Sequence, residues 1–423
     1  MSAPRWYWAF VLANAAMGAA SPLLPLYAYF LGATAGGVGM LTAVGSVMNV
    51  VASLIWGRVL DSTPRRRLFV SLAFLGVALA YLVLPLATGL PQLFLVNGWA
   101  AFSWMAGASV SFLLVLSRFP RDQWEKEIAR FNVYCGVGWT LGLVVGAGWT
   151  SLVVRWLGEG WALQSLGLIV AALSLSAIVV ALREIREPQA GSQAASLRDV
   201  VVSMGNFLYE RFRTGPIHLY EAIRPSQLVR FMQGRTAFGP DLVLVYYSAL
   251  LAFIGFAMVF APFPVFVRQA LGWPSALVFA LSVAHHGVSV VAFGWARRAV
   301  ARWGHRPAAA LALLGRAGMF VGFALATPVT ARWLLPVLWG VAGATWAFFQ
   351  LSVTAIVSRL SPHGLHGQAL GTYNAVAGLG HVLGALAGGF VADFIGFRAA
   401  FLFGAMLMVV TLPILLVEGR PVK

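Results

Sequence analysis

One glycine-rich stretch occurs twice in the chain and decides its fold. Residues 132–146 read NVYCGVGWTLGLVVG, and residues 374–388 read NAVAGLGHVLGALAG. One asparagine and four glycines coincide at a constant offset of 242 residues, with no gap. The sequence therefore predicts two homologous halves, each of which carries this stretch as one of its helices.

Two further pairs of segments support the duplication. Ser117 and Arg118 are followed, at an offset of 241, by a second Ser-Arg pair at 358–359. The pair Pro22 and Pro25 has a counterpart in Pro262 and Pro264. Each proline pair lies in the predicted first helix of its half, and both pairs lie near the same end of that helix.

The repeated glycines mostly lie four residues apart, which places them on one face of a helix. Without side chains, such a face lets another membrane helix approach closely, and it also lets helices shift against each other. We expect helix packing at Gly138, Gly142, Gly146, Gly380, Gly384 and Gly388.

The composition indicates that lipid surrounds most of the chain. Of its 423 residues, 60% are hydrophobic and 10% are charged, and the mean hydropathy is +0.83. Soluble domains carry roughly 25% charged residues. A bilayer core requires about 20 apolar residues per helix. Twelve such windows occur, at 7–30, 36–57, 68–88, 92–116, 129–154, 162–182, 241–267, 274–295, 307–328, 332–357, 367–392 and 397–417.

These windows predict an all-α membrane protein of twelve transmembrane helices in two pseudo-symmetric six-helix bundles. We expect the N-terminal bundle at 1–182, a linker at 183–240 and the C-terminal bundle at 241–423. Within the linker, apolar and charged residues alternate at helical spacing from Leu197 to Phe212. That pattern predicts an amphipathic helix on the inner membrane surface, where it either serves as a connector or binds lipid or a partner.

The basic residues orient the chain. With the N-terminus inside, 24 of the 29 Lys and Arg residues fall in inner segments and four in outer loops. This bias predicts cytoplasmic termini in a multi-pass protein of the cell inner membrane. The formal charge of +16 therefore reflects topology and does not indicate nucleic-acid binding.

Several function classes lack the residues that they require. The single cysteine, Cys135, excludes an internal disulfide and a cysteine-based metal site. No Gly-x-x-x-x-Gly-Lys loop for a nucleotide occurs, and no nucleophile, metal cluster or acid pair is expected at membrane depth. We therefore expect no catalytic residues, no metal, no cofactor and no enzymatic activity.

The loop between the second and third helices carries a family motif. It reads GRVLDSTPRRR at 57–67, which resembles the Gly-x-x-x-Asp-Arg-x-Gly-Arg-Arg motif of the major facilitator superfamily. The matching residues are Gly57, Asp61, Arg65 and Arg66, whereas Ser62 and Pro64 depart from the motif. Residues 388–398 also match the family's junction of helices 11 and 12.

This resemblance implies two halves that rock around a central site. It also implies that Asp61 faces the positive N-terminal end of helix 11 and holds the inner gate closed in the outward-facing state. The alternative is that the loop arginines serve only topology. Residues 96–99 lack the arginine of many proton-coupled members, and residues 142–147 lack the proline of many drug antiporters.

Ionisable residues at mid-membrane are costly and default to functional candidates. All 13 acids fall in or next to loops, which argues against a carboxylate proton relay. The remaining candidates for proton coupling are His285, His286 and His381, because histidine changes charge near neutral pH. Each could instead be a hydrogen-bonded packing residue. Arg316 lies in the ninth helix, which the resemblance implies is peripheral, and this position favours a structural role for it.

The resemblance implies that helices 1, 4, 7 and 10 line the central cavity. The polar and aromatic candidates for substrate binding on these helices are Asn14, Tyr27, Asn97, Trp104, Tyr246, Trp346 and Gln350. Each could instead hydrogen-bond a neighbouring helix. The set describes a mostly neutral, aromatic cavity that suits a small neutral or lipophilic organic solute.

We therefore expect a secondary active or facilitative transporter that works by alternating access. An exporter is the first hypothesis, and uptake of a sugar-like or other neutral metabolite is the alternative; a non-transporting membrane sensor is a remote one. The expected partners are a small-molecule substrate, protons as a candidate coupling ion and the lipid bilayer, and the expected oligomeric state is a monomer.

Overall fold

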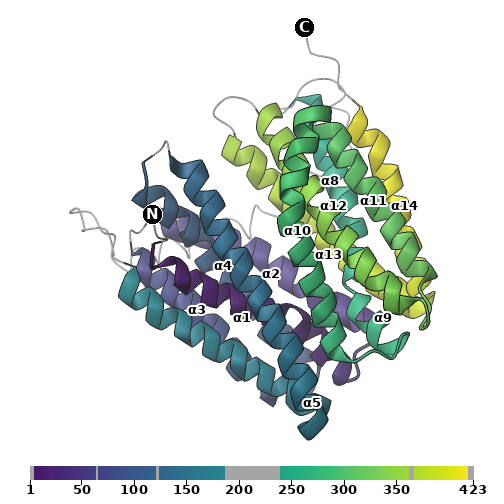
Figure 1. The fold of residues 1–423 in the computed structure, drawn as a ribbon. Helices are drawn as coiled ribbons and strands as arrows, with labels where there is room; N and C mark the ends of the chain where they lie inside the picture. The colour runs from purple at the N-terminus through teal and green to yellow at the C-terminus, as the bar shows by residue number, and fades with distance from the viewer. Residues whose placement is uncertain (1–3, 63–64, 121–122, 186–238, 362–365, 418–423) are drawn as a thin grey trace, which may run out of the picture.

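The computed structural model describes residues 4–62, 65–120, 123–185, 239–361 and 366–417. The amphipathic helix expected from Leu197 to Phe212 lies outside this part of the chain. Figure 1 shows the course of the chain, with a colour that runs from purple at the N-terminus to yellow at the C-terminus.

The N-terminal half forms a bundle of long helices. Its longest helix, α5, has 61 residues and is broken at Gly158, whose φ of 81° and ψ of 171° are non-helical. Glycine adopts such a positive φ without a steric penalty, so α5 consists of two arms that each correspond to one expected window. The elements are α1 (Tyr7–Phe30), α2 (Ala35–Ser62), α3 (Arg66–Leu82), the short 3₁₀ helix η1 (Leu84–Leu86), α4 (Leu90–Arg118) and α5 (Trp124–Glu184).

The C-terminal half repeats this arrangement with one interruption. The expected window at 241–267 is divided between α8 and α9, because Pro262 and Pro264 cannot donate backbone hydrogen bonds and stop the helix. The elements are α8 (Pro240–Phe260), α9 (Phe263–Gln269), α10 (Ser275–Trp303), α11 (His305–Leu325), α12 (Ala331–Leu360), α13 (His366–Phe394) and α14 (Phe397–Leu416).

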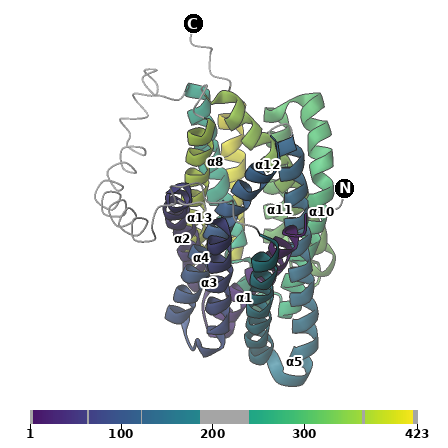
Figure 2. The same cartoon turned by 90° about the vertical axis from the view of Figure 1, so that its left-hand side faces the viewer.

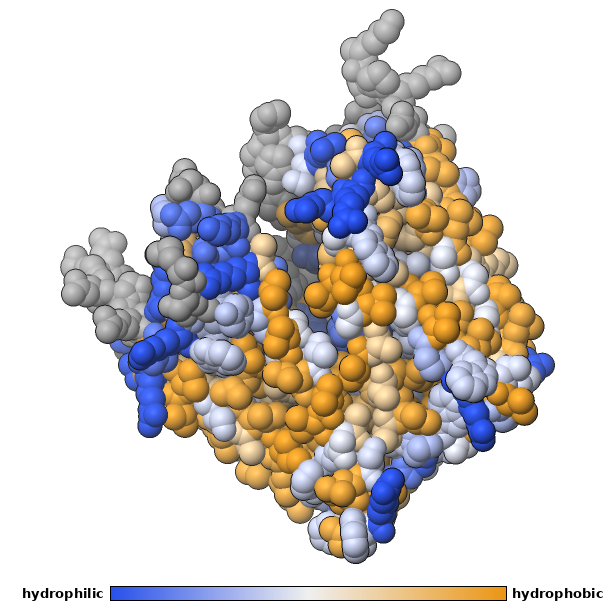
Figure 3. Space-filling view, viewed as in Figure 1, coloured by the Kyte–Doolittle hydropathy of each residue, from blue (hydrophilic) through white to orange (hydrophobic). Residues whose placement is uncertain are grey.

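The described residues contain 11 helical segments that are long and apolar enough to cross a membrane. One of them, Lys126–Glu184, is 59 residues long and contains the Gly158 break, so it supplies two crossings. The predicted fold of twelve membrane helices is thereby confirmed. Figure 3 shows a hydrophobic belt on the outside of both halves. Large apolar side chains such as Leu95 and Val337 are exposed on the surface of the molecule.

The two halves lie side by side and form a V in Figure 1. Figure 2 turns the molecule by 90°, so that the N-terminal half lies in front of the C-terminal half. They meet at the lower end of Figure 1, where α2 packs against α13 and α5 packs against α10. At the upper end a hollow separates them, and hydrophilic side chains flank it (Figure 3). We call the lower end the closed end and the upper end the open end.

The chain direction assigns the basic residues to these two ends. The described arginines of the expected inner segments, such as Arg65, Arg118 and Arg359, lie at helix termini of the open end. Arg268 and Arg398 lie at helix termini of the closed end. The basic residues of the expected inner segments therefore lie at the open end, and those of the expected outer loops lie at the closed end.

Two pairs of the repeated glycines, Gly138 with Gly380 and Gly142 with Gly384, lie in equivalent helix contacts of the two halves. A Cβ atom added at Gly138 or Gly142 of α5 would overlap backbone atoms of α1. In the same way, a Cβ added at Gly384 or Gly388 of α13 would overlap backbone carbonyls of α8. Gly380 also meets α8, whereas Gly146 lies against the ring of Phe279 in α10. Close backbone approach thus joins α1 to α5 and α8 to α13.

Candidate functional site

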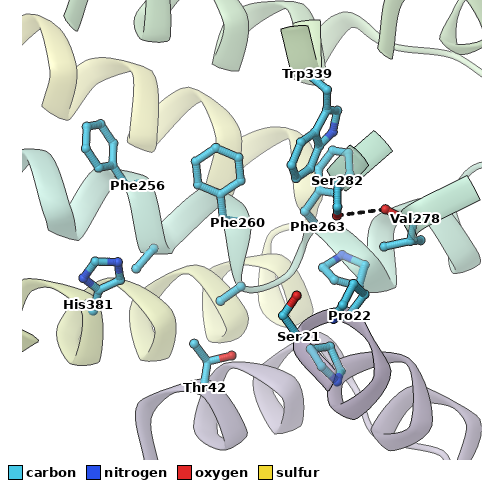
Figure 4. Close-up of a pocket in the computed structure, with 14 residues that line it drawn as sticks. Ser21, Pro22, Thr42, Phe256, Phe260, Phe263, Val278, Ser282, Trp339 and His381 are labelled. Atoms are coloured by element: carbon cyan, nitrogen blue, oxygen red, sulfur yellow. Dashed lines mark hydrogen bonds between the residues drawn. The ribbon is translucent and has the colours of Figure 1, made fainter. Parts of the chain in front are cut away.

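A cavity of about 250 Å³ lies between the two halves, at the level of Thr42 in α2 and His381 in α13 (Figure 4). Its wall combines side chains of the N-terminal half with side chains of the C-terminal half, so any rocking of the halves changes its shape. The lining residues are Ser21, Pro22, Pro25, Thr42, Phe256, Ala257, Phe260, Ala261, Phe263, Pro264, Val278, Ser282, Trp339 and His381.

Three of the four duplicated prolines line this cavity. Pro22 and Pro25 lie within α1, and Pro264 lies in the first turn of α9. Pro22 and Pro25 each leave a carbonyl of α1 without its usual N–H partner. Pro264 stands in the first turn of α9, where a backbone N–H has no partner within the helix in any case. The prolines therefore mark the place where α1 and the α8–α9 junction, equivalent elements of the two halves, face each other.

Three hydroxyl groups supply hydrogen-bonding capacity. Ser21 donates to the carbonyl of Gly18 at 3.2 Å, Thr42 donates to the carbonyl of its own helix one turn earlier at 3.0 Å, and Ser282 does the same at 3.0 Å. In these conformations the hydroxyl hydrogens are engaged, so each oxygen is left as an acceptor. The three groups come from α1, α2 and α10, and they can meet polar groups of a solute from both halves.

Aromatic rings of α8, α9 and α12 form one wall of the cavity (Figure 4). The rings of Phe260 and Trp339 are 5.5 Å apart between centroids, and those of Phe263 and Trp339 are 4.9 Å apart. The indole N–H of Trp339 is buried and meets no acceptor among the described residues. This wall combines a large apolar surface with one unused hydrogen-bond donor, an arrangement typical of pockets for small organic ligands.

His381 lies beside these rings and is the one proton-coupling candidate that lines the cavity. Its Nδ1 is 3.1 Å from the carbonyl oxygen of Ala377, and its ring is 5.0 Å from that of Phe253. If Nδ1 carries the proton, it donates to Ala377 and leaves Nε2 as an acceptor.

Arg316 lies directly behind the aromatic wall. Its side chain is 1% exposed. Its guanidinium carbon is 4.2 Å from the ring centre of Phe256 and 5.3 Å from that of Phe260, and both rings line the cavity. The cavity wall is therefore backed by a positive charge.

A network of polar groups joins the halves at the closed end. Glu159, next to the Gly158 break in α5, accepts hydrogen bonds at 2.5 Å from both Arg268 and Ser275. Arg268 also donates to the backbone carbonyl of Trp273 at 2.6 Å. The carboxylate of one half is thus held by α9 and α10 of the other half. Charge-assisted bonds of this kind are among the stronger polar contacts in proteins.

A second polar contact joins α13 to the start of α2. The carboxylate of Asp393 accepts the backbone N–H of Gly36 at 2.9 Å. The first N–H groups of a helix have no partner within the helix, and a negative charge there also interacts favourably with the helix dipole. A Cβ atom at Gly36 would lie 2.6 Å from the Asp393 carboxylate, so a side chain at this position would displace the carboxylate.

We expect Asp393→Asn to weaken the closed end moderately. The amide keeps a hydrogen-bond acceptor but loses the charge, and a charge at a helix N-terminus contributes about 0.3–1 kcal/mol. The population in which the closed end has opened should therefore rise by about two- to fivefold. Distance distributions between spin labels on α2 and α13 measure this change, and Asp241→Asn at the open end is the control that should leave it unaltered.

Four of the seven predicted substrate-binding residues make hydrogen bonds within the helix bundles. Asn14 donates to the carbonyl of Phe10 in its own helix at 2.8 Å. The other three donate to backbone carbonyls outside their own helix: Tyr27 to Ala87, the residue after η1, Asn97 to Leu41 in α2, and Tyr246 to Ala369 in α13. None of these four lines the cavity described above, and their predicted contact with the solute stays a prediction.

The other three candidates, Trp104, Trp346 and Gln350, are half-buried and also lie outside the lining of this cavity. The ring of Trp346 is 6.5 Å from that of Phe253 and its centre is 5.9 Å from the Arg316 guanidinium carbon, and neither of these two residues lines the cavity. A substrate role for these three residues likewise stays a prediction.

The adjacent histidines of α10 face different neighbours, as their position on a helix requires. The ring of His285 is 5.7 Å from that of Trp339 in α12, and the ring of His286 is 5.9 Å from that of Trp139 in α5. The latter contact crosses between the halves. Neither histidine lines the cavity, so a role in coupling would require a change of conformation.

The predicted gate motif is described only in part. Gly57 and Asp61 belong to the last turns of α2, but their side-chain environment lies outside the described part of the chain. Arg65 is exposed just before α3, and Arg66 is half-buried as its first residue. The latch at Asp61 therefore stays a prediction.

Sequence reasoning missed the hydroxyls and the phenylalanines of the cavity. Ser21 was within reach, because it adjoins the duplicated proline Pro22. Thr42, Ser282, Phe256 and Phe260 carry no such signal, since serine, threonine and phenylalanine are common throughout membrane helices. Among the described residues, no group of three or more His, Cys, Asp and Glu side chains could hold a metal ion.

Comparisons with known proteins agree with this architecture. A family model described as Major Facilitator Superfamily matches residues 6–349 and 330–423. No curated protein matches the sequence. Among solved structures, a variant of the nucleoside transporter NupG is similar at 15% identity and a TM-score of 0.74, over 97% of this chain and 98% of that one.

Two further structures have the same fold. A POT family transporter in complex with a thioalcohol-conjugated peptide is similar at 11% identity and a TM-score of 0.70, over 97% of this chain and 94% of that one. The human organic anion transporter TETRAN is similar at 19% identity and a TM-score of 0.59, over 97% and 98% of the two chains. At these identities the likeness extends to the fold alone.

Proposed function

The chain belongs to the Major Facilitator Superfamily and is a secondary transporter, and we propose that it moves a small, largely apolar organic solute by alternating access. The observation that carries this proposal is the cavity between the halves, with its wall of Phe256, Phe260, Phe263 and Trp339. Such a wall can bury the apolar body of a solute, and the few hydroxyls orient it.

The proposed cycle uses the two ends of the molecule in turn. In the structure, the Glu159–Arg268 pair and the Asp393–Gly36 contact seal one end, while the other end is hollowed. Rocking of the halves would separate these partners and bring the opposite ends of the bundles together. We assign the contact of Asp61 with helix α13 to that second state.

The open end faces the cytoplasm in this proposal, because it carries most of the described arginines and the positive-inside rule places them there. The chain would then lie in the inner membrane with both termini inside. Export is the proposed direction, since an apolar solute can enter the hollow from the cytoplasm or the inner leaflet. Flux measured separately in right-side-out and inverted membrane vesicles decides between export and uptake.

A second candidate is a neutral solute with several hydroxyl groups. The three hydroxyl oxygens of Ser21, Thr42 and Ser282 favour it, because they are acceptors on both sides of the cavity. The two candidate solutes are separated by competition between an aromatic alcohol and a nucleoside for binding to the purified protein. A site for an apolar solute binds the alcohol and does not bind the nucleoside.

The aromatic wall is tested by replacing Trp339 with alanine. This change removes the largest side chain of the cavity and its unused N–H donor, so we expect flux of an accepted solute into liposomes to fall about tenfold or more. Trp333→Ala is the matched control, because this tryptophan of the same helix is 83% exposed on the outer surface and should not matter. Equal loss in both variants would show that the cavity is not the site.

A further inference from the structure

Arg316 is a charged side chain at membrane depth that the proposed cycle leaves without a role. It lies eleven residues after the start of α11, or about 17 Å along the helix axis, and it is 1% exposed. Arginine stays protonated in proteins. A full positive charge is therefore buried near the middle of the membrane, where charges are costly and default to a function.

Only neutral groups surround this charge in the described part of the chain. The guanidinium donates to the hydroxyl of Thr345 and to the carbonyl of Ala342, each at 3.1 Å. The faces of Phe256, Phe260 and Trp346 lie 4.2, 5.3 and 5.9 Å from the guanidinium carbon. Cation–π contacts and dipoles lower the cost of burial, but they leave the net charge of the site at +1.

No described acid forms an ion pair with Arg316. The acids whose side chains the structure describes lie close to helix ends or to the Gly158 break, away from the middle of α11. They are Glu127, Glu159, Glu184, Asp241 and Asp393. A structural arginine in a membrane protein usually pairs with an acid or with several carbonyls. Here the counter-charge is missing from the described residues.

The cavity is the place where a counter-charge can enter. Phe256 and Phe260 line it and also contact the guanidinium, so one layer of aromatic rings separates the charge from a bound solute. The described lining contains no acid that would repel an anion. It does contain the buried, unpartnered indole N–H of Trp339, which can donate to an anionic oxygen.

We propose that the solute is a lipophilic organic anion, such as an aryl carboxylate, whose charge Arg316 stabilises through the aromatic wall. This inference rests on the proposed function and adds the charge of the solute to it. The apolar body would pack against the phenylalanines, and the carboxylate would lie on the side of Trp339. Because the site has a low dielectric constant, the attraction acts across the rings without direct contact.

The test compares two probes that differ only in charge. Equilibrium binding of radiolabelled 2-naphthoate and 2-naphthamide is measured on the purified full chain. We expect the wild type to prefer the acid by about tenfold or more, which corresponds to about 1.4 kcal/mol. Arg316→Met should abolish this preference, mainly by weakening the binding of the acid.

Two further variants separate charge from structure. Arg316→Lys keeps a positive charge and should keep a preference for the acid, while Thr345→Val removes a hydrogen bond of Arg316 and should keep the full preference. These two variants also keep the proposal testable if Arg316→Met fails to fold. An acid preference that Arg316→Lys loses as completely as Arg316→Met would overturn the role of charge.

The outcomes also separate this inference from the proposed function. If the wild type binds the amide as tightly as the acid or more tightly, the anionic assignment is overturned, whereas an apolar cavity remains supported. If the wild type binds neither probe, or if Trp339→Ala leaves the binding of both unchanged, the cavity itself is refuted and both proposals fall.

Discussion

Replacing Gly142 with alanine is expected to destabilise the protein by about 3 kcal/mol or more, at the upper end of the range for overpacked sites. The added methyl group would overlap the carbonyl of Ala15 and approach the backbone nitrogen of Ala19. These are backbone atoms of α1, so no side-chain rotation can relieve the overlap. Helices α1 and α5 would have to separate along their contact.

The same change at Gly384 should have a similar effect, because this residue occupies the equivalent place in the other half. Its added methyl group would overlap the carbonyl of Ile254 in α8. We expect each variant to lower the apparent melting temperature of the detergent-purified protein by about 5 °C or more. Comparable losses at both positions would show that the duplicated glycines do the same work in both halves.

Gly136 and Gly371 provide matched controls on the same two helices, α5 and α13. An added Cβ meets no atom within 4 Å at either position. Alanine is a better helix former than glycine by about 1 kcal/mol, so these controls should be neutral or slightly stabilising. If Gly142→Ala melts like Gly136→Ala, close backbone approach does not hold α1 and α5 together.

The fold could be predicted from the sequence because two independent signals agreed. Apolar windows of about 20 residues locate membrane helices, and the constant offset of 242 residues relates the halves. Helix ends were less predictable. The reversal in α5 depends on the positive φ of Gly158, and the α8–α9 break depends on where Pro262 stands relative to the end of its helix.

The cavity lining was harder to predict, for a physical reason. In a soluble protein the polar face of a helix marks the surface, but lipid tails are as apolar as a protein interior. The apolar pattern therefore does not show which face of a membrane helix meets a cavity. Polar residues do not show it either, since Asn97 and Tyr246 hydrogen-bond the backbone of neighbouring helices.

The gate at the closed end was unpredictable for another reason. Glu159 and Arg268 are separated by 109 residues and belong to different halves. The sequence places each of them in a short predicted outer loop, where a charged side chain is expected simply because water solvates it. Only the packing of α5 against α10 brings them together, and that packing belongs to one conformational state of the transporter.

Replacing Glu159 with arginine is expected to force the closed end open and to abolish net transport. The Glu159 and Arg268 side chains are 25% and 19% exposed, so the pair is partly shielded from water. Loss of such a pair costs about 1–3 kcal/mol, between the values for exposed and buried pairs. Repulsion between two arginines adds to this cost, and the population should shift by about 100-fold toward the state in which the closed end is open.

Accessibility of a single cysteine measures this shift. Cys135 is the only native cysteine, so Cys135→Ser gives a background for Thr42→Cys, which places a thiol in the lining of the cavity. A membrane-impermeant maleimide added on the side of the closed end should label this thiol slowly in that background and rapidly once Glu159→Arg is added. Glu184→Arg, at the open end of the same helix, is the control that should not accelerate labelling.

The double variant Glu159→Arg with Arg268→Glu decides whether the pair itself is the gate. It restores opposite charges across the same contact, so labelling from the closed end should slow again and transport should return in part. Full recovery is not expected, because Ser275 loses its carboxylate acceptor and the carbonyl of Trp273 loses its guanidinium donor. If the double variant labels as fast as Glu159→Arg alone, attraction between these two side chains does not seal the closed end, and the packing of α2 against α13 has to carry that role.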